Sequence, residues 1–457
     1  IGEAILFLTS PAAASITGTT LVMDGGACLL NIIWIGTSML LYVSTSLGAE
    51  HESIQCFSMD GGNGALEPHS TLAVLNRPTF IIAHPTLPII YSVADGDDGE
   101  GVVAALPLNR EDGGFLQPHH TLEQQPSGGQ SPCHLSINAH GSVLCVANYG
   151  SGTFSTLELT AQGGFAQRGQ RFSFIGVGTH PIRQTGSHIH ASIFSPSERH
   201  VLATDLGLDR LVRFRSTGGQ HPRLHIDGMI ETPDGSGPRH LRFADDGRFL
   251  YVVLELSNEV AVYRWHEENG EAHLLQVIST LPPEHDRSVQ HTASEIHISR
   301  SGHHLWVANR GDGSIVRYTR ERETGLLGEA QHFLCDGRLP RHFTVDETGR
   351  WMAIANTDTN AVVLCSIDPQ TGRILSKGHH AAVEKPMCVL FAQSQEQLGC
   401  VQRQEHRCNV TAMRGIAGSW TMQWILLSPP SHRHNAAALG TAGERAKAKF
   451  LIHHSCG

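Results

Sequence analysis

The sequence predicts an all-β chain that folds as a seven-bladed β-propeller, with non-propeller segments at both ends. A pattern of short apolar strands recurs seven times, about every 50 residues. The strands are dense and almost no sustained helical periodicity separates them, which indicates an all-β chain. Repeats of about 50 residues fit four-stranded propeller blades, whereas the repeats of a β-solenoid, the structural alternative, are usually shorter.

The repeat is clearest around four glycine turns. ADDGRFLYVVLE, NAHGSVLCVANY, SRSGHHLWVANR and DETGRWMAIANT share one frame, and SPSERHVLATDL, HPTLPIIYSVAD and TSMLLYVSTS are looser copies. The turn residues of the seven copies are Ser38, Pro88, Gly141, Glu198, Gly247, Gly302 and Gly349, at spacings of 47 to 57 residues. We therefore expect one propeller over residues 39–395.

Each copy is expected to contribute several strands. An apolar strand follows the turn and usually ends in a polar residue seven positions on; these ends are Thr45, Asp95, Asn148, Asp205, Leu254, Asn309 and Asn356. In the better copies a strand precedes the turn, as in HLSIN, HLRFA, EIHIS and HFTVD. A third strand often follows, as in FSTLEL, RLVRFR, EVAVYRW and SIVRYTR. The order fits a blade built from consecutive antiparallel hairpins.

Charge and composition exclude several classes of protein. The net charge is −10 and no basic stripe is present, so we expect no nucleic-acid partner. The most apolar run, residues 28–43, is interrupted by polar residues and is shorter than the ~20 residues of a spanning helix. We interpret it as buried strand and expect no membrane segment. The ten cysteines form no CxxC pair, which favours reduced thiols and a cytoplasmic location.

The sequence gives little indication of a metal or cofactor. It contains 30 histidines but no HExxH motif. The one close spacing is HIH at 188–190, where strand alternation puts His188 and His190 on one face. A metal pair there is the alternative to a buried structural histidine. We expect no cofactor and no metal.

The candidate site emerges when polar positions are compared between copies. The stretch GPRHLRFADDGRFLYVVLEL, residues 237–256, places Arg239 at the start of one hairpin and Glu255 at its end. Equivalent starts are Cys133, His190, Ser294 and Arg341, and equivalent ends are Tyr149, Leu206, Arg310 and Thr357. The start and end of a hairpin lie side by side at its open end. His190, Arg239, Glu255, Arg310 and Arg341 should therefore meet on one face, around the central channel.

Simpler interpretations compete at each position. A single Arg or Glu at a strand end is usually a solvated tip, and only the equivalence across blades favours a shared site. DLGLD (205–209) offers two carboxylates, for which a turn-stabilising role is the main interpretation. NYGSG (148–152) and NRGDGS (309–314) are interpreted as tight turns, with ligand contact as a secondary role.

Several phrases resemble the β-propeller lactonase family, which includes one class of 6-phosphogluconolactonase and the fungal 3-carboxy-cis,cis-muconate lactonising enzyme. They are SPCHLSINAHGSVLCVANYGSGT, GSHIHASIFSP with TDLGLD, SGPRHLRF with VVLEL, SEIHISRSGHHLWVANRG and LPRHFTVDETGRWMAIAN. Residues 1–28 instead resemble the C-terminal end of short-chain dehydrogenases, without that family's Gly-rich loop or catalytic Tyr and Lys. We interpret 1–30 as a remnant without redox activity and 396–457 as a tail of uncertain structure.

The resemblance implies a metal-independent propeller whose catalytic set is His190, Arg239, Glu255 and Arg310 in this sequence. Arg341, His188, Asn148 and Asn309 are expected to bind substrate. The family usually has Asn before that Glu, and Leu254 departs from the pattern, which puts the orientation of Glu255 in question. Arginine binds carboxylate or phosphate through its planar fork, whereas either His190 or Glu255 could act as general base.

The expected function is hydrolysis of a small anionic sugar lactone, 6-phosphogluconolactone to 6-phosphogluconate in the pentose phosphate pathway. A muconate-type cycloisomerase is the enzymatic alternative. A non-catalytic propeller that binds a protein partner is the alternative of another class, because fold does not fix function. An inactive fusion product is a third alternative, motivated by the two flanks. The sequence carries no signal for the oligomeric state.

Overall fold

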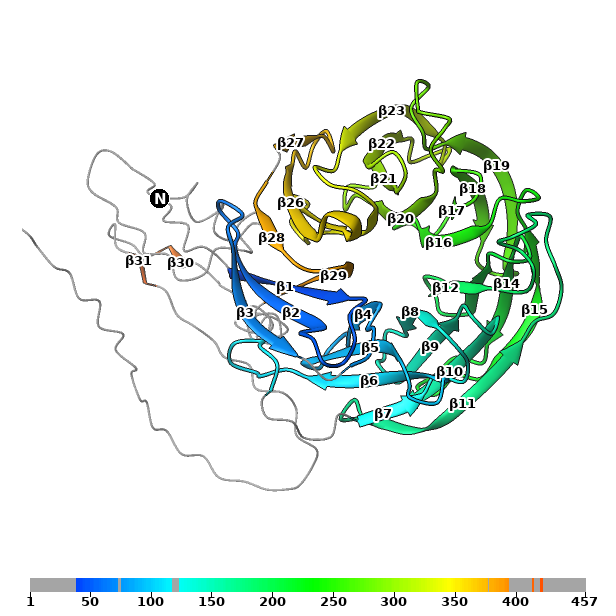
Figure 1. Cartoon of the computed structure of the whole chain (residues 1–457), viewed down its shortest axis with the longest axis horizontal. Coiled ribbons are helices and arrows are strands. Elements are labelled where there is room, and N and C mark those ends of the chain that lie inside the picture. Colours follow the sequence, from blue (N-terminus) through cyan, green and yellow to red (C-terminus); the bar gives the residue numbers. More distant parts are fainter. Residues whose placement is uncertain are drawn as a thin grey trace, which may run out of the picture. The chain divides into compact units, whose positions relative to one another are not determined.

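The computed structural model describes residues 38–72, 75–116, 123–376 and 378–393, together with two short strands near the C-terminus. The first unit of the chain forms a ring of antiparallel sheets around a central channel, the seven blades of a β-propeller (Figure 1). The expected all-β fold with seven blades is confirmed.

The bounds of the blades, each written from its innermost strand outward, are as follows. Blade 1 is β29 (Pro386–Gln393), β1 (Ser38–Thr45), β2 (Ile54–Asp60) and β3 (Leu66–Leu72). Blade 2 is β4 (Phe80–Ala83), β5 (Ile89–Asp95), β6 (Gly101–Pro107) and β7 (Glu123–Pro126). Blade 3 is β8 (Pro132–Ile137), β9 (Val143–Asn148), β10 (Thr153–Leu159) and β11 (Phe165–Ser173). Blade 4 is β12 (Ile189–Phe194), β13 (His200–Asp205), β14 (Arg210–Ser216) and β15 (Leu224–Glu231).

The remaining blades follow the same order. Blade 5 is β16 (Pro238–Phe243), β17 (Phe249–Leu254), β18 (Glu259–His266) and β19 (Glu271–Ser279). Blade 6 is β20 (Ala293–Ile298), β21 (His304–Asn309), β22 (Ser314–Arg320) and β23 (Leu327–Leu334). Blade 7 is β24 (Pro340–Val345), β25 (Trp351–Asn356), β26 (Ala361–Ile367) and β27 (Ile374–Ser376), with β28 (His380–Ala382) also paired to β26 and a short 3₁₀ helix, η2 (Thr357–Thr359), after β25.

Blade 1 joins the two ends of the propeller and closes the ring. Its innermost strand β29 pairs with β1 from Met39↔Gln393 to Ser44↔Cys388. β29 also contacts the innermost strands on either side, β24 and β4. Pairing of the first strand with the last removes the open edges that an incomplete ring would leave. The repeat frame did not anticipate this pairing, because the strand that completes blade 1 comes from the far end of the sequence.

The turn residues that aligned the copies have a common backbone conformation. Gly141, Glu198, Gly247, Gly302 and Gly349 have φ between 57° and 71°, in the left-handed region. Each backbone amide donates to the carbonyl three residues back, as in Gly247 N to Ala244 O at 2.9 Å. Glycine adopts this φ without steric cost, so it recurs at the turn. The looser fourth copy adopts the same turn with Glu198.

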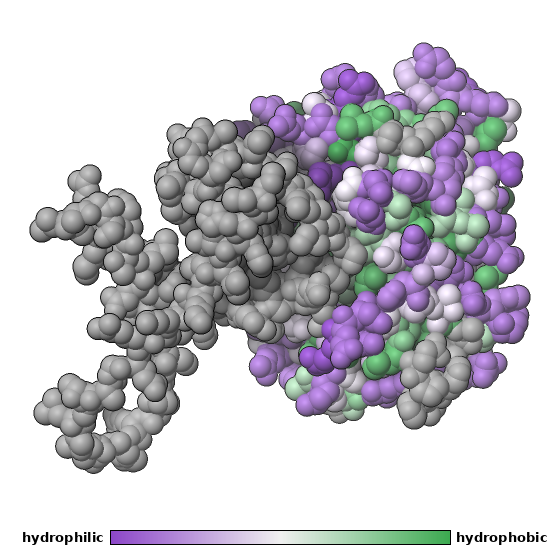
Figure 2. Space-filling view, turned by 90° about the vertical axis from the view of Figure 1, so that its left-hand side faces the viewer, coloured by the Kyte–Doolittle hydropathy of each residue, from purple (hydrophilic) through white to green (hydrophobic). Residues whose placement is uncertain are grey.

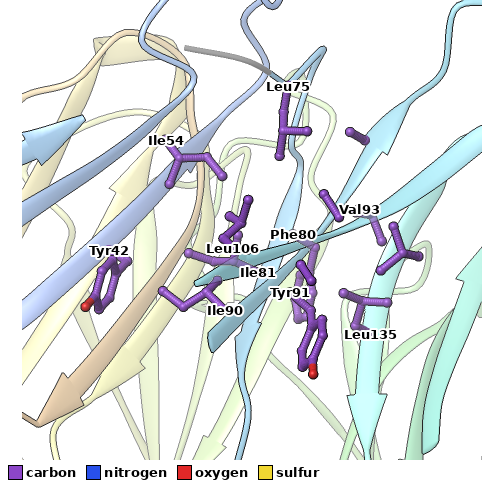
Figure 3. Packing of buried hydrophobic residues seen from close by; sticks show 14 of the residues in the cluster. Tyr42, Ile54, Leu75, Phe80, Ile81, Ile90, Tyr91, Val93, Leu106 and Leu135 are labelled. Carbon is purple, nitrogen blue, oxygen red and sulfur yellow. The ribbon is translucent and has the colours of Figure 1, made fainter. Parts of the chain in front are cut away.

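Buried tyrosines of the second strands connect neighbouring blades. The hydroxyls of Tyr42, Tyr91 and Tyr251 donate to the carbonyls of Gly113, Gly163 and Gly325, at 2.5, 2.6 and 2.7 Å. Each acceptor glycine lies in the outer turn of the following blade. The rings of Tyr42 and Tyr91 pack with Ile54, Phe80 and Leu135 in one apolar cluster that extends over blades 1 to 3 (Figure 3). The interfaces between blades are thus apolar, with the tyrosine hydroxyls hydrogen bonded.

The flanks lie largely outside the described residues. This applies to the dehydrogenase-like segment 1–30 and to 396–457, except for β30 (Met413–Arg414) and β31 (Trp420–Thr421), which pair with each other in the second unit. Of the apolar run 28–43, the described part, 38–43, is strand β1 as expected. Within the described part of the chain, no helix has the length and apolar character needed to cross a bilayer.

Candidate active site

One pocket of about 230 Å³ collects the predicted side chains at one face of the ring. His190, Arg239 and Arg341 lie in the innermost strands β12, β16 and β24. Glu255 and Arg310 directly follow β17 and β21. The full lining is Arg77, Thr79, Asp95, Ser131, Pro132, Cys133, Tyr149, Arg183, His190, Arg239, Glu255, Arg310, Arg341 and Met387. The expected convergence of the five ionisable side chains is confirmed.

The pocket has an excess of positive charge. Its lining includes five arginines and two carboxylates, which leaves three net positive charges. The whole chain carries a net charge of −10, so this positive charge is local. Such a pocket selects anionic ligands even though the protein as a whole is acidic.

Glu255 is the centre of the arginine cluster and is 1% exposed. Its Oε1 accepts a hydrogen bond from Arg183 Nη2 at 2.7 Å. Its Oε2 lies 3.1 Å from Arg239 Nη1 and 3.0 Å from Arg310 Nη2. Burial raises the pKa of this carboxyl, but the three guanidiniums outweigh burial and hold the pKa well below its usual range. Glu255 is therefore a firmly ionised carboxylate with little basicity.

Backbone contacts fix the position of this carboxylate and of two of its partners. The amide of Glu255 donates to Gly237 O at 2.7 Å, and Gly237 has a φ of 63° that favours glycine. Arg239 Nε donates to Ser294 O at 3.1 Å. Arg310 Nη2 donates to Ala293 O at 3.2 Å. The start of β20 therefore holds both guanidiniums against Glu255.

His190 lies beside the arginines as a neutral ring. Its Nε2 accepts a hydrogen bond from Arg239 Nη1, because a guanidinium can only donate. Burial, followed by Arg239, His240, Arg341 and Arg310, lowers the pKa of His190 well below its ordinary value. The ring also packs edge-on to Tyr149, with centroids 5.5 Å apart.

Arg341 has no counter-ion of its own in the described structure. Its guanidinium forms no hydrogen bond or salt bridge with another described residue. Burial and then the neighbouring Arg239 and Arg310 lower its pKa to about 9. A cation that is destabilised in this way gains most when an anion enters the pocket.

Arg183 was missed by the sequence comparison. It comes from the loop between β11 and β12, outside the repeat frame, and Nη2 also donates to the hydroxyl of Tyr149 at 3.2 Å. Gln184 anchors the loop, since its Nε2 donates to Leu206 O at 2.9 Å and to Asp209 Oδ1 at 2.7 Å. A position without an equivalent in other blades gives no signal in a repeat alignment.

Arg77 and Asp95 form a second ion pair in the lining, 3.2 Å between Nη1 and Oδ2. Asp95 ends β5 in the repeat frame, whereas Arg77 precedes blade 2 in an irregular connection. Arg77 has a φ of 52°, which is uncommon for a residue with a side chain. Its amide donates to Leu47 O at 2.8 Å, so the surrounding backbone holds it in that conformation.

Asn148 and Asn309, which the sequence predicts to bind substrate, are fully buried, and neither lines the pocket. Asn148 Nδ2 donates to Ser127 O at 3.2 Å, and Asn309 Nδ2 donates to Thr280 O at 2.7 Å. Asn356, at the equivalent position of blade 7, donates in the same way to Cys335 O at 3.1 Å. These asparagines fix the connection that precedes each innermost strand.

His188 also lies outside the lining, although it contacts a residue within it. Its ring stacks on Tyr149 with centroids 4.4 Å apart, and Nδ1 lies 2.9 Å from Tyr149 O. The carboxylates of DLGLD were expected to stabilise their own turn, but they bond to other segments: Asp205 accepts from Ser187 Oγ and His188 N, and Asp209 accepts from Gly235 N and Gly237 N. Through its contacts with Tyr149, His188 supports the wall of the pocket.

Leu254 occupies the position of these asparagines in blade 5. It is fully buried in an apolar cluster with Leu241, Val252 and Ala261. Its substitution for Asn removes a backbone-fixing amide, while the carboxylate of Glu255 is oriented by Arg183, Arg239 and Arg310. The departure from the family pattern thus affects packing behind the site.

The described side chains do not form a metal-binding geometry. Within the ranges that the structure describes, no three His, Cys, Asp or Glu side chains are grouped to hold a metal ion. In the pocket itself, His190 Nε2 and the Glu255 carboxylate are engaged by arginines. These donors are occupied by cations, which disfavours a second cation in the same place.

The fold and the pocket together define a class: a seven-bladed propeller with an arginine-rich pocket at one face of its channel. The sequence profile "Lactonase, 7-bladed beta-propeller" matches residues 40–391. The chain therefore belongs to the seven-bladed β-propeller lactonase family and is an enzyme of the lactonase class.

The matches to individual relatives cover almost the whole length of each relative. A 6-phosphogluconolactonase from Bacillus subtilis is 31% identical over 78% of this chain and 99% of the relative. A 6-phosphogluconolactonase from Formosa agariphila is 28% identical over 70% of this chain and 90% of the relative. Among solved structures, a periplasmic gluconolactonase from Pseudomonas aeruginosa is 28% identical, covers 78% of this chain and 99% of its own, and superposes with a TM-score of 0.70.

Proposed function

We propose that this protein hydrolyses 6-phosphogluconolactone to 6-phosphogluconate without a metal ion, in the pocket around Glu255. The observation that carries the proposal is the excess of three positive charges in one pocket that also contains a neutral histidine. The relatives named 6-phosphogluconolactonase support the same substrate.

The charge of the pocket fits this lactone. A phosphate monoester carries about −1.5 to −2 charges at neutral pH, and hydrolysis of the lactone adds a carboxylate. Arg341, whose charge is uncompensated, and Arg77, whose side chain is 58% exposed in the lining, are available to bind these anions. Arginine forks bind phosphate and carboxylate oxygens through paired hydrogen bonds.

Of the two candidate bases, His190 is the better one. The three guanidiniums around Glu255 stabilise its charged form and so weaken it as a base. His190 is neutral and can accept a proton at Nε2 once Arg239 turns from that atom toward the substrate. The incoming negative charge also offsets the arginines that depress the pKa of His190, which makes the ring a stronger base in the complex.

Each bond change can then be assigned to a side chain. His190 Nε2 takes a proton from water as the water oxygen bonds to the lactone carbonyl carbon. Arg239 and Arg310, whose own side chains are largely buried, stabilise the oxyanion that develops. The proton on His190 then passes to the ring oxygen as its bond to carbon breaks, which leaves the open-chain acid. Glu255 remains paired with Arg310 and with Arg239 as Arg239 turns from His190 toward the substrate.

Two alternatives make different predictions. A muconate-type cycloisomerase would use the same arginines for two carboxylates and the same histidine for proton transfer. A non-catalytic propeller would present a binding patch on its surface, but the part of the surface that Figure 2 colours mixes hydrophilic residues with small hydrophobic areas. The charged side chains that converge in the pocket favour a small anionic ligand.

The cellular setting is part of the proposal. We place the activity in the cytoplasm, where the pentose phosphate pathway consumes 6-phosphogluconolactone, although one relative is a periplasmic enzyme. Free thiols at Cys56, Cys133, Cys145, Cys335 and Cys388 fit a reducing compartment. No nucleic-acid or membrane partner is proposed.

Purified protein tests the proposal with three substrates side by side. The rate of ring opening is measured for 6-phosphogluconolactone, for unphosphorylated gluconolactone and for a muconate-derived lactone, with and without a chelator. We expect the highest kcat/KM for the phosphorylated lactone, unchanged by the chelator. Preference for the muconate lactone supports the cycloisomerase, and loss of activity in chelator refutes metal independence.

A further inference from the structure

A second buried cluster lies next to His190, outside the lining of the pocket. His240 on β16 and Glu295 on β20 are 2% and 1% exposed, and His240 Nδ1 lies 2.7 Å from Glu295 Oε2. The His240 ring is 5.3 Å from the His190 ring, centroid to centroid, at an interplanar angle of 63°. Neither residue has a role in the reaction described above.

Glu295 is held as a carboxylate by several donors. His342 Nε2 lies 3.1 Å from Oε2, while Arg242 Nη2 and the Ile296 amide donate to Oε1 at 3.4 and 3.0 Å. Burial alone would raise its pKa, but His240 and His342 outweigh burial and lower it well below the usual range. Burial lowers the pKa of His342, but Cys388 and then Glu295 outweigh burial and raise it to about 10, so a cationic His342 lies against Glu295.

The hydrogen bonds determine the tautomers of the two neighbouring histidines. A carboxylate only accepts, so Nδ1 of His240 carries the proton and Nε2 has the lone pair. Arg239 only donates, so Nε2 of His190 has the lone pair and Nδ1 carries the proton. The buried Nδ1 of His190 and the buried Nε2 of His240 both lack a hydrogen-bond partner in the described structure. A donor and an acceptor are thus left over on adjacent rings.

We propose that His240 and Glu295 form a positioning pair for His190: Glu295 fixes the tautomer of His240, and His240 Nε2 accepts a hydrogen bond from Nδ1–H of His190 when that ring becomes charged during lactone hydrolysis. The inference rests on the proposed function, in which Nε2 of His190 takes the proton of the attacking water. Nδ1 keeps its own proton throughout, and the Nε2 proton leaves with the ring oxygen. His240 and Glu295 end the cycle unchanged.

The surroundings of His240 explain why the pair is needed. Of the groups that face it, Arg239 and Arg242 from β16, His190 from β12 and His134 from β8 all disfavour positive charge there, and His342 on β24 is a cation. Glu295 is the carboxylate in contact with the His240 ring. Among these groups, only Glu295, acting through His240, can therefore stabilise a positive charge on the His190 ring.

The test uses the full-length protein and variants at His240. His240→Phe removes the acceptor, His240→Gln can restore it through its side-chain oxygen, and Glu295→Gln keeps the shape but removes the charge. We expect His240→Phe and Glu295→Gln to lower kcat roughly tenfold to hundredfold, the range seen when outer partners that orient a functional histidine are removed. KM should change little, and His240→Gln should recover part of the loss.

His134→Phe is the matched control, since its buried ring lies 5.2 Å from His240 but forms no hydrogen bond or ion pair with Glu295. It should leave kcat close to the wild-type value. Equal losses in His134→Phe and His240→Phe, or wild-type kcat in both Glu295→Gln and His240→Phe, would overturn the inference.

A second readout does not depend on activity. Nitrogen-15 NMR of the imidazoles in the ligand-free protein should show His190 as the Nδ1–H tautomer in both the wild type and His240→Phe, because Arg239 sets it, and should show that His190 becomes charged at a lower pH in His240→Phe, where the charged ring has lost its acceptor. Charging of His190 at the same pH in His240→Phe and the wild type refutes the positioning pair, even if the wild-type protein fails to hydrolyse the lactone and the proposed function falls. If His240→Phe does not fold, Glu295→Gln and His240→Gln provide the same comparison.

Discussion

Arg239 and Glu255 lie 16 residues apart in the sequence, at the two open ends of the hairpin β16–β17, and their side chains meet with 3.1 Å between Nη1 and Oε2. Both are almost completely buried, so neither is the solvated tip that an isolated strand end would suggest. Arg239 also contacts His190 from the preceding blade, and Glu255 also binds Arg310 from the following one. One hairpin therefore links three blades at the site.

Replacement of Glu255 by Gln should destabilise the protein. The change leaves three guanidiniums without their shared carboxylate, and breaking a buried ion pair costs about 3–5 kcal/mol. Urea denaturation of the variant and the wild type gives the difference. Glu323→Gln, whose carboxylate is 80% exposed and pairs with Arg248, is the control and should cause no measurable loss. Equal stability of wild type and Glu255→Gln would show that the cluster is not held by this carboxylate.

The stabilising effect of Glu255 should depend on pH in one direction. Its folded-state pKa is depressed, so the contribution is complete above the unfolded pKa of about 4.3 and is lost as the pH falls through the folded value. The stability gap between wild type and Glu255→Gln should be constant near neutrality and narrow only under acid conditions. A gap that narrows between pH 8 and 6 would assign the effect to another group.

His190→Gln should abolish most of the catalysis and preserve the fold. General base catalysis contributes roughly 10²- to 10⁴-fold, and glutamine can still accept the hydrogen bond from Arg239. In the wild type, the pKa of His190 is lowered well below its ordinary value, so the ring is still neutral at pH 6.5. The acid limb of the kcat/KM profile should therefore lie below pH 6.5. The acid limb of kcat should lie at higher pH, because bound anion offsets the arginines. A kcat/KM limb at or above pH 6.5 would contradict this.

Arg341→Met should weaken the preference for phosphorylated substrate. Loss of one charge-assisted hydrogen bond costs about 1.5–3 kcal/mol, so kcat/KM for 6-phosphogluconolactone should fall at least tenfold. The unphosphorylated lactone should lose less. Stability should not fall, since removal of this cation relieves repulsion with Arg239 and Arg310. A stability loss as large as that of Glu255→Gln would indicate a structural role.

Leu254→Ala should separate packing from chemistry. Leu254 is fully buried in the apolar cluster of blades 4 and 5, and Leu-to-Ala changes in such cores cost about 2–5 kcal/mol. The carboxylate of Glu255 is held by other residues, so kcat at a temperature where the variant is folded should stay near the wild-type value. A large fall in kcat with normal stability would restore the concern that Leu254 orients Glu255.

The domain assignment can be tested by truncation. A chain limited to residues 39–395 retains β1 from Met39 onward and all of β29, the two strands that close the ring. It should fold, as judged by circular dichroism and thermal unfolding, and should keep the lactonase activity of the full-length protein. Loss of both properties would show that the flanks contribute to the propeller.

Much of the site could be predicted because the repeat makes it visible. The left-handed turn at Gly247 and its equivalents fixed the frame, and a fixed frame places Arg239, Glu255 and Arg310 at the same end of their hairpins. The same logic does not place Asn148 and Asn309 correctly relative to the pocket, because a polar residue at a strand end can bond to the neighbouring backbone as easily as it can point toward a ligand. Only side-chain geometry distinguishes these two cases.

Other features were beyond the repeat comparison. Arg183 enters the pocket from a loop with no counterpart in other blades, so no repeat position singles it out. The pairing of β1 with β29 joins segments more than 300 residues apart, which a local pattern does not show. The choice between His190 and Glu255 as base depended on the number of arginines around the carboxylate.

The measurement that tests the central claim most directly is the initial rate of ring opening of 6-phosphogluconolactone by the purified full-length protein, compared with the spontaneous rate in the same buffer. We predict a rate well above the spontaneous one at saturating lactone for the wild type, and a rate close to the spontaneous one for His190→Gln. No acceleration by folded wild-type protein would contradict the proposed substrate, and full activity of folded His190→Gln would contradict the proposed site.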